Sequence, residues 1–320
     1  MKGCTTTEDL INSLKNHKAI FHFNDSDSVQ DIVDRLDYIN QSFIKDETGY
    51  KLVDSTEGVK KSVTQEAQKV VKGKPFNPTP EQSLVFNQQA EIGNFVHDVS
   101  EEMMREVLSL IDGKSVRESL SLLKNITLNN LTLEGVKKIE SEYQRSVNRR
   151  DDSMNNTLLG VVQLLQEVYK QQNLINKKTK LDGRPTIRLE QKVIDAKRDI
   201  GGTIDFLAIL SDKSAIIRDY KTKIPKKGVL DEFGNLVSLK KLFSKSDNKK
   251  YEFQIGEYGK ILQSAFGITG IRSSGLVPVL LDVPFNKGEF SKIVSGIKFP
   301  GQDKLLEQIR PFAEKTGFNT

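Results

Sequence analysis

The chain has 320 residues, of which 28% are charged and 37% hydrophobic, a composition typical of a globular protein with a sizeable core. Its formal net charge is +5 and its pI about 9.0, which favours an anionic partner such as nucleic acid. A single cysteine, Cys4, excludes a disulfide framework and a four-cysteine metal or iron–sulfur site. The N-terminus lacks the apolar run of a signal peptide, and no stretch approaches the roughly 18 apolar residues of a membrane span. The sequence therefore predicts an intracellular, cytoplasmic protein with no membrane partner.

The N-terminal region, residues 1–75, is expected to be irregular with one helical patch. Apolar residues at helical spacing predict that helix over 27–44. The segment GYKLVDSTEGVKKSVT, residues 49–64, is expected to form a hairpin or a loop. Three prolines within residues 72–80 mark a break before the next region.

The middle region, residues 76–180, is expected to be helical. Apolar residues recur at spacings of three and four, as packed helices require. This pattern predicts helices over 81–110, 115–124, 131–148 and 154–175. A polar turn is then expected over 176–185.

The C-terminal region, residues 181–320, changes to the two-residue period of strands. Its pattern predicts strands over 186–194, 202–210 and 214–221, then a hairpin with a basic loop over 228–250. A helix over 250–267 ended by Gly267, a strand over 275–283 and a closing helix over 302–315 are expected to follow. A helical region followed by a small sheet with helices predicts an α/β or α+β fold.

Two aspartates and a lysine interrupt the apolar strands of this region. Asp205 lies within one predicted strand, Asp219 ends the next, and Lys221 follows two residues later on the same side. A tight turn between the strands would bring Asp205 close to Asp219. Two converging carboxylates repel unless a cation lies between them, and their oxygens suit Mg²⁺ or Mn²⁺. The alternative is a salt bridge between Asp219 and Lys221, because the Asp/Glu-x-Lys triplet occurs at least five times in this charged chain.

Three motifs in a fixed order carry a resemblance to a known family. They are Gly-x-x-Asp (Gly202 to Asp205), Asp-Tyr-Lys-Thr (Asp219 to Thr222) and Gln-x-x-x-Tyr (Gln254 to Tyr258). In this order they resemble the PD-(D/E)XK nuclease superfamily, in its RecB-type exonuclease branch. The branch also carries an upstream Gly-x-x-x-His, as in Gly93 to His97, and a glutamate before the Gly-x-x-Asp strand, which Glu190 matches. The segment Ser62-Val63-Thr64 is similar to one in members such as the mitochondrial genome maintenance exonuclease.

The resemblance implies a restriction-endonuclease-like core, with a central mixed sheet flanked by helices and a helical insertion between His97 and Glu190. It implies a metal-dependent deoxyribonuclease that hydrolyses phosphodiester bonds in DNA with Mg²⁺ or Mn²⁺, acting on single-stranded ends or flaps. An endonuclease of the same fold is one alternative. A degenerate module that binds nucleic acid or a partner protein without cleavage is the other.

Residues that the sequence lacks limit which subtype of the nuclease branch it can belong to and which functions a partner protein would have to supply. One cysteine excludes the iron–sulfur members of the branch. Leu108 stands where a Walker A loop needs glycine, so a helicase or another replication or recombination protein would be a separate partner. A phage or a mobile element could encode such a nuclease.

The resemblance also implies a set of metal ligands. His97, Asp205 and Asp219 would hold the metal, and the Tyr220 carbonyl would be a further oxygen ligand. Glu190 would contact a water on the metal or a second ion.

The remaining motif residues would act beside the metal. Lys221 would position the attacking hydroxide, and Gln254 and Tyr258 would brace Lys221 or contact a phosphate. Basic residues that could contact DNA backbone cluster over 176–180, 221–227 and 240–250, although solvated loops also carry such runs.

Overall fold

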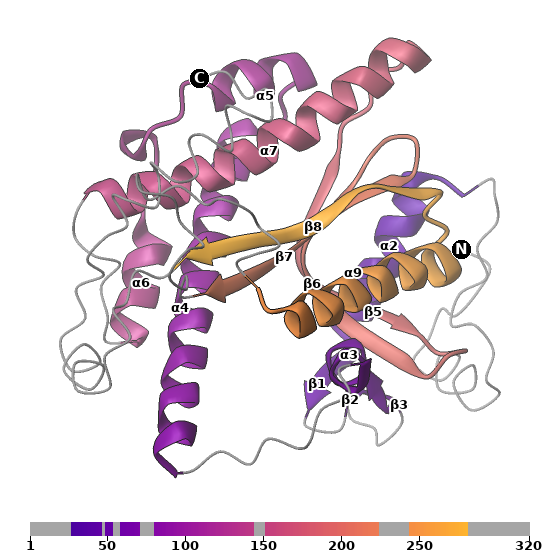
Figure 1. Cartoon of the computed structure of the whole chain (residues 1–320). Helices are drawn as coiled ribbons and strands as arrows, with labels where there is room; N and C mark the ends of the chain where they lie inside the picture. The colour runs from indigo at the N-terminus through magenta and orange to yellow at the C-terminus, as the bar shows by residue number, and fades with distance from the viewer. Residues whose placement is uncertain are drawn as a thin grey trace. The chain divides into compact units, whose positions relative to one another are not determined.

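The computed structural model of the chain forms two compact units (Figure 1). It describes residues 27–46, 49–53, 58–70, 80–143, 151–223 and 243–280. The first of the two units, which we call the sheet unit, comprises Met1–Gly73, Gln171–Asp219 and Ser246–Val277. We call the second the helical unit; it comprises Lys74–Lys170, Tyr220–Lys245 and Pro278–Thr320.

The described part of the sheet unit begins with helix α2, Val29–Ser42. Ser28 and Asp31 form a capping box, in which the Asp31 N–H donates to Ser28 Oγ and the Ser28 N–H donates to Asp31 Oδ2 at 2.7 Å. The buried apolar residues recur at helical spacing and face the core of the unit. The helix predicted over 27–44 is therefore confirmed.

Four short strands and a helix follow where an irregular region was expected. β1 (Phe43–Asp46), β2 (Gly49–Leu52) and β3 (Gly58–Val59) form an antiparallel sheet in that order, so a hairpin joins β2 and β3. β4 (Lys61–Ser62) pairs instead with the main sheet and leads into α3 (Val63–Val70). β2 and β3 fall within the segment 49–64, which was expected to form a hairpin or a loop. β1 and β4 were not expected, because strands of two to four residues are too short to show a hydrophobic period.

The main sheet is built around β6, Ile200–Ile209. β5 (Thr186–Asp195) pairs antiparallel with β6 from end to end, and β7 (Ser214–Lys223) pairs antiparallel with its C-terminal half. β4 pairs in parallel with the start of β6, and β8 (Gly270–Leu280) pairs with β7. The sheet is therefore mixed, and the predicted mixed α/β class is confirmed.

Helix α9, Lys245–Phe266, packs on this sheet in the core that the two share. It begins within the segment expected to be a basic loop, because the polar run 245–250 forms its first turns without an apolar period. Gly267 follows it with φ 76, the left-handed conformation predicted for the residue that ends the helix. The expectations for residues 72–79, for 228–242 and for a closing helix over 302–315 lie outside the described residues.

The predicted helices of the middle region are confirmed. They are α4 (Pro80–Ile111), α5 (Val116–Leu123), α6 (Glu134–Glu142) and α7 (Asp151–Thr179). In the helical unit, Tyr143 after α6 donates to Asp98 Oδ2 of α4 at 2.5 Å, and its ring lies 5.3 Å from that of Phe95. Across the described ranges, the helices are all too short or too polar to cross a membrane.

A buried ion network joins the turn after β5 to α9. Arg198 donates to Asp195 Oδ2 at 2.7 Å and to Glu257 Oε2 at 2.8 Å, and Ser264 Oγ donates to Asp195 Oδ2 at 2.8 Å. Burial raises the pKa of Asp195, but the hydrogen bonds from Arg198 and Ser264 outweigh it and hold that pKa below its ordinary value. Burial likewise raises the pKa of Glu257, and the bonds from Lys260 and Arg198 lower it by more.

We expect this network to make the fold sensitive to acid. The ordinary pKa values of Asp195 and Glu257 are 3.8 and 4.5, and both are lowered in the folded chain. The stability that they contribute is therefore fully present above about pH 5 and is lost as the pH falls through the lowered folded values. The urea midpoint of unfolding, measured from about pH 7 down to about pH 3, should show this loss. In the Asp195→Asn variant, the urea midpoint should fall less steeply as the pH is lowered, because one of the two carboxylates is gone. An unchanged pH dependence would show that Asp195 does not contribute this stability.

Candidate metal centre

Three carboxylates share one row across the strands of the sheet unit. The register of β5 on β6 sets Glu190 opposite Asp205. The register of β6 on β7, continued by one residue beyond its last pair, sets Asp219 opposite Asp205 from the other side. Opposite residues of an antiparallel pair have Cα atoms about 5 Å apart, so the three residues are neighbours across the strands.

The row coincides with an interruption of both ladders. The pairing of β5 with β6 skips the Glu190–Asp205 position, and the pairing of β6 with β7 ends one residue before Asp219. Glu190 has φ 50, a left-handed backbone conformation that costs a non-glycine residue about 1–2 kcal/mol. Strain of this kind persists only where the surrounding structure imposes it, and it is frequent at functional sites.

Asp219 is held from inside the protein by the Gln-x-x-x-Tyr motif. It is 1% exposed, and its Oδ1 accepts from Gln254 Nε2 at 3.0 Å. The same amide nitrogen lies 3.1 Å from the Tyr258 hydroxyl. Gln254 and Tyr258 are themselves buried, so in this structure they brace Asp219, a different partner from the Lys221 expected from the resemblance.

The charges of both aspartates act on the Tyr258 hydroxyl. Burial raises the pKa of Tyr258 well above its ordinary value of 10.0, and the negative charges of Asp219 and Asp205 raise it further. Tyr258 therefore stays a neutral phenol that adds no negative charge to the site.

Sequence reasoning missed one tyrosine of this site, Tyr50 on β2. Its hydroxyl lies 2.9 Å from Thr203 Oγ1 on β6, two residues before Asp205. Burial raises the pKa of Tyr50 to about 12, and the charge of Glu190 also raises it. No motif marks Tyr50, because a tyrosine in a four-residue strand shows neither a period nor a spacing.

Lys221 follows Asp219 on β7 and is half-buried. Its Nζ donates to the Tyr220 carbonyl oxygen at 3.2 Å. That oxygen is the one expected to be a metal ligand. A carbonyl oxygen has two lone pairs, so the hydrogen bond is compatible with a cation at the same atom.

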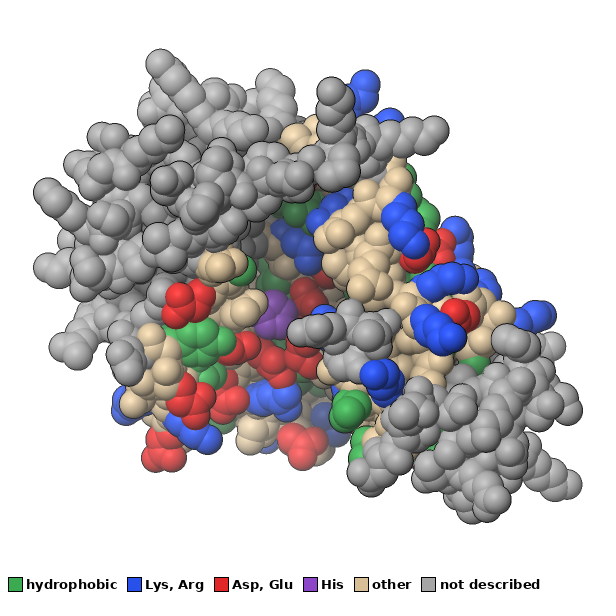
Figure 2. Space-filling view, turned by 90° about the horizontal axis from the view of Figure 1, so that it is seen from below, with side chains coloured by type: hydrophobic (Ala, Val, Ile, Leu, Met, Phe, Trp, Pro, Cys, Tyr) green, Lys and Arg blue, Asp and Glu red, His purple; other side chains and the backbone are tan. Residues whose placement is uncertain are grey.

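The expected ligand His97 lies on α4, in the helical unit. Its ring packs edge-to-face against the Tyr220 ring, with centroids 5.4 Å apart and an interplanar angle of 83°. Because Tyr220 is the middle residue of the Asp-Tyr-Lys motif, this contact joins the upstream histidine to the strand segment that carries the motif. His97 is half-buried and is the only histidine within the described residues, so it is the purple side chain at the surface in Figure 2.

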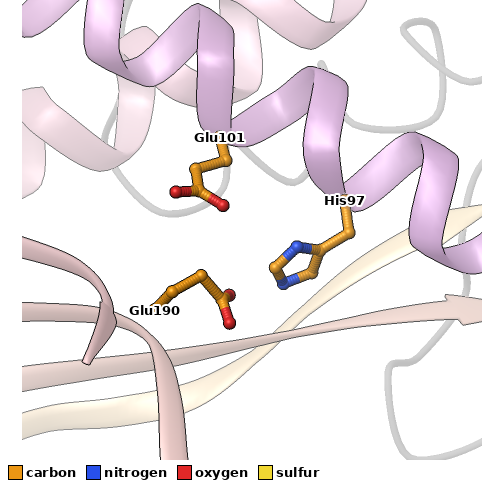
Figure 3. Close-up of side chains that lie close together, drawn as sticks. All are labelled: His97, Glu101 and Glu190. Atoms are coloured by element: carbon orange, nitrogen blue, oxygen red, sulfur yellow. The ribbon is translucent and has the colours of Figure 1, made fainter. Parts of the chain in front are cut away.

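A further acidic residue, Glu101, lies one turn after His97. Figure 3 shows both side chains leaving the same face of α4, and it also labels Glu190 on β5. Glu101 forms an ion pair with Arg105, one turn further along the helix. The signal in the sequence is the His-x-x-x-Glu spacing, which places two ligand types on one helix face.

The donor types fit a hard divalent cation. Carboxylate oxygens suit both Mg²⁺ and Mn²⁺, and Mn²⁺ also accepts the imidazole nitrogen that His97 offers. No protein-family model, curated protein or solved structure matches the chain. The carboxylate row, with a lysine next to it in the sequence, is therefore what points to a function.

Proposed function

We propose that the chain is a metal-dependent nuclease of the PD-(D/E)XK type that hydrolyses phosphodiester bonds in DNA. The observation that carries this proposal is the row of Glu190, Asp205 and Asp219, with Lys221 two residues further on the same strand. Adjacent carboxylates in a partly buried site repel one another, and a divalent cation removes that cost while leaving all of them ionised.

Asp205 and Asp219 would hold the cation through their oxygens, with His97 and the Tyr220 carbonyl as further ligands. When bound, the cation lowers the pKa of a coordinated water and polarises the scissile phosphate. Asp219 is suited to this task because the buried Gln254 amide fixes the direction of its carboxylate.

The other residues of the row act on water and on the phosphate. The Lys221 ammonium orients the attacking water by hydrogen bonding and offsets the charge that develops on the phosphate oxygens. Glu190, at its strained position, accepts a hydrogen bond from water at the edge of the row. Both roles need groups that stay fixed while the substrate enters, and a strand holds them more rigidly than a loop does.

The charge of the chain supports a nucleic-acid substrate. Part of the basic cluster 176–180 forms the last turn of α7, where Lys177 and Lys178 are exposed. Lys180 follows, also exposed. Exposed cations of this kind neutralise phosphates without reading sequence, as a nuclease that degrades DNA from an end requires.

Three substrates test this function against its alternatives. The purified protein with Mn²⁺ is incubated with linear single-stranded DNA, a flapped duplex and a covalently closed single-stranded circle, and a preparation of Asp219→Asn controls for contaminating nucleases. We expect the linear strand and the flap to be degraded, the circle to resist, and chelation of the metal to stop all cleavage. Rapid cutting of the circle would favour the endonuclease, and binding without cleavage of any substrate would favour the degenerate module.

The metal preference tests the role of His97. We expect a higher initial rate with Mn²⁺ than with Mg²⁺ at equal low concentration, because Mg²⁺ rarely accepts an imidazole nitrogen, and we expect Ca²⁺ to bind without turnover. His97→Ala should lower the rate and narrow the difference between Mn²⁺ and Mg²⁺. The measurement is the initial rate against metal concentration for both proteins. A variant with its full rate and the original ratio would show that His97 is not a ligand.

A further inference from the structure

Two adjacent glycines on β6 each lie against a tyrosine ring. A Cβ atom on Gly201 would lie 3.0 Å from Tyr50 Cδ2, and a Cβ atom on Gly202 would lie 2.4 Å from Tyr258 Cε1. Consecutive residues of a strand direct their Cβ atoms to opposite faces, so the two rings approach β6 from different sides. A larger residue at 202 would displace the Tyr258 ring, so glycine at this position is what admits it.

From one side, the Tyr258 hydroxyl reaches Asp219 through Gln254. The Gln254 amide nitrogen carries two hydrogens, one for Asp219 Oδ1 at 3.0 Å and one for the Tyr258 oxygen at 3.1 Å. If this amide turned over, its oxygen would face the carboxylate and repel it. The carboxylate therefore selects this amide orientation, and the Tyr258 oxygen holds the amide in place by accepting its second hydrogen.

From the other side, the Tyr50 hydroxyl reaches the strand that carries Asp205. It lies 2.9 Å from Thr203 Oγ1, and Thr203 and Asp205 are two apart on β6. Both tyrosines are buried, with Tyr50 2% and Tyr258 1% exposed. Burial also keeps both phenols neutral, since it raises the pKa of Tyr50 to about 12 and that of Tyr258 well above 10.0.

We propose that Tyr50 and Tyr258 are a pair of positioning residues, admitted by Gly201 and Gly202, that fix the carboxylate row from both sides of β6. Tyr258 acts through Gln254 on Asp219, and Tyr50 acts through Thr203 on the segment that carries Asp205. This inference rests on the proposed function in taking the row to be a cation site. The inference makes the small sheet of β1, β2 and β3, in which no motif lies, a part of that site.

The test measures Mn²⁺ affinity of the full chain by calorimetry, without DNA. The variants are Tyr50→Phe and Tyr258→Phe, which remove only a hydroxyl, and the control is Tyr169→Phe, a tyrosine of α7 that is 3% exposed. Loss of a group that orients a metal ligand typically weakens metal affinity or activity about 10- to 100-fold. We expect about 10-fold weaker binding for Tyr258→Phe, a smaller loss for Tyr50→Phe and none for the control.

Two further variants and one kinetic measurement sharpen the test. Thr203→Val should reproduce the effect of Tyr50→Phe, and combining the two should add little, because each removes one partner of the same hydrogen bond. Where the protein cleaves DNA, kcat should fall in the Phe variants while KM for DNA stays unchanged, because the tyrosines act on the cation site and not on DNA.

The outcomes separate this inference from the proposed function. Unchanged Mn²⁺ affinity in both Phe variants overturns the inference. A lower melting temperature of the variants would not rescue it, because the two tyrosine hydroxyls would then only stabilise the fold. Weakened affinity in a protein that never cleaves DNA supports the tyrosine pair and overturns the nuclease. A wild-type chain that binds no Mn²⁺ overturns both.

Discussion

Asp219→Asn is expected to abolish DNA cleavage and to weaken metal binding together. The substitution keeps the shape of the side chain and leaves an oxygen for the Gln254 amide at 3.0 Å, but it removes the negative charge that a divalent cation needs. We expect the cleavage rate to fall at least about 100-fold, and the affinity for Mn²⁺ in calorimetric titration to fall with it.

Lys221→Ala is expected to abolish cleavage while leaving metal binding within a few-fold of the wild type. A lysine ammonium donates three hydrogen bonds and has no lone pair for a cation, so its loss removes the group that orients water and offsets phosphate charge. Lys137→Ala, an exposed lysine of α6 outside the three basic clusters, is the matched control and should change neither property. Cleavage by Lys221→Ala at the wild-type rate would show that the proposed role is wrong.

The fold was predictable from sequence where an element is long enough to show a period. β5, β6 and β7 each have ten residues and were predicted to within two residues at every end. α4 was expected over 81–110 and spans Pro80–Ile111. β2 and β3 fell within a segment expected to be a hairpin or a loop, but β1 and β4 were not predicted, because such short strands show no local pattern and β4 depends on pairing with the distant strand β6.

The candidate site was predictable in its residue types but not in its geometry. The order of the motifs indicated Glu190, Asp205 and Asp219, yet only the strand register shows that they lie in one row. The bond between Tyr50 and Thr203 joins residues 153 apart, and no spacing rule reaches that far. Nor does the sequence show that the glutamate of this row has a left-handed backbone, since residue type does not mark such strain.

The strain at Glu190 leads to the last prediction, in which a variant gains stability while it loses activity. Glu190→Gly should remove the strain of a left-handed non-glycine residue, which costs the folded chain about 1–2 kcal/mol. Glycine also makes the unfolded chain more flexible, which lowers the free energy of unfolding by about 0.5–1 kcal/mol. The midpoints of these ranges leave a net gain of about 0.75 kcal/mol, which should raise the urea midpoint, while DNA cleavage falls because the row has lost a carboxylate. Glu190→Gln is the matched control: it removes the same charge and keeps the strained backbone, so the difference in stability between the two variants isolates the backbone contribution. Equal stability would show that φ 50 carries no strain here. Full cleavage by both variants would remove Glu190 from the site and leave Asp205 and Asp219 as its only strand carboxylates.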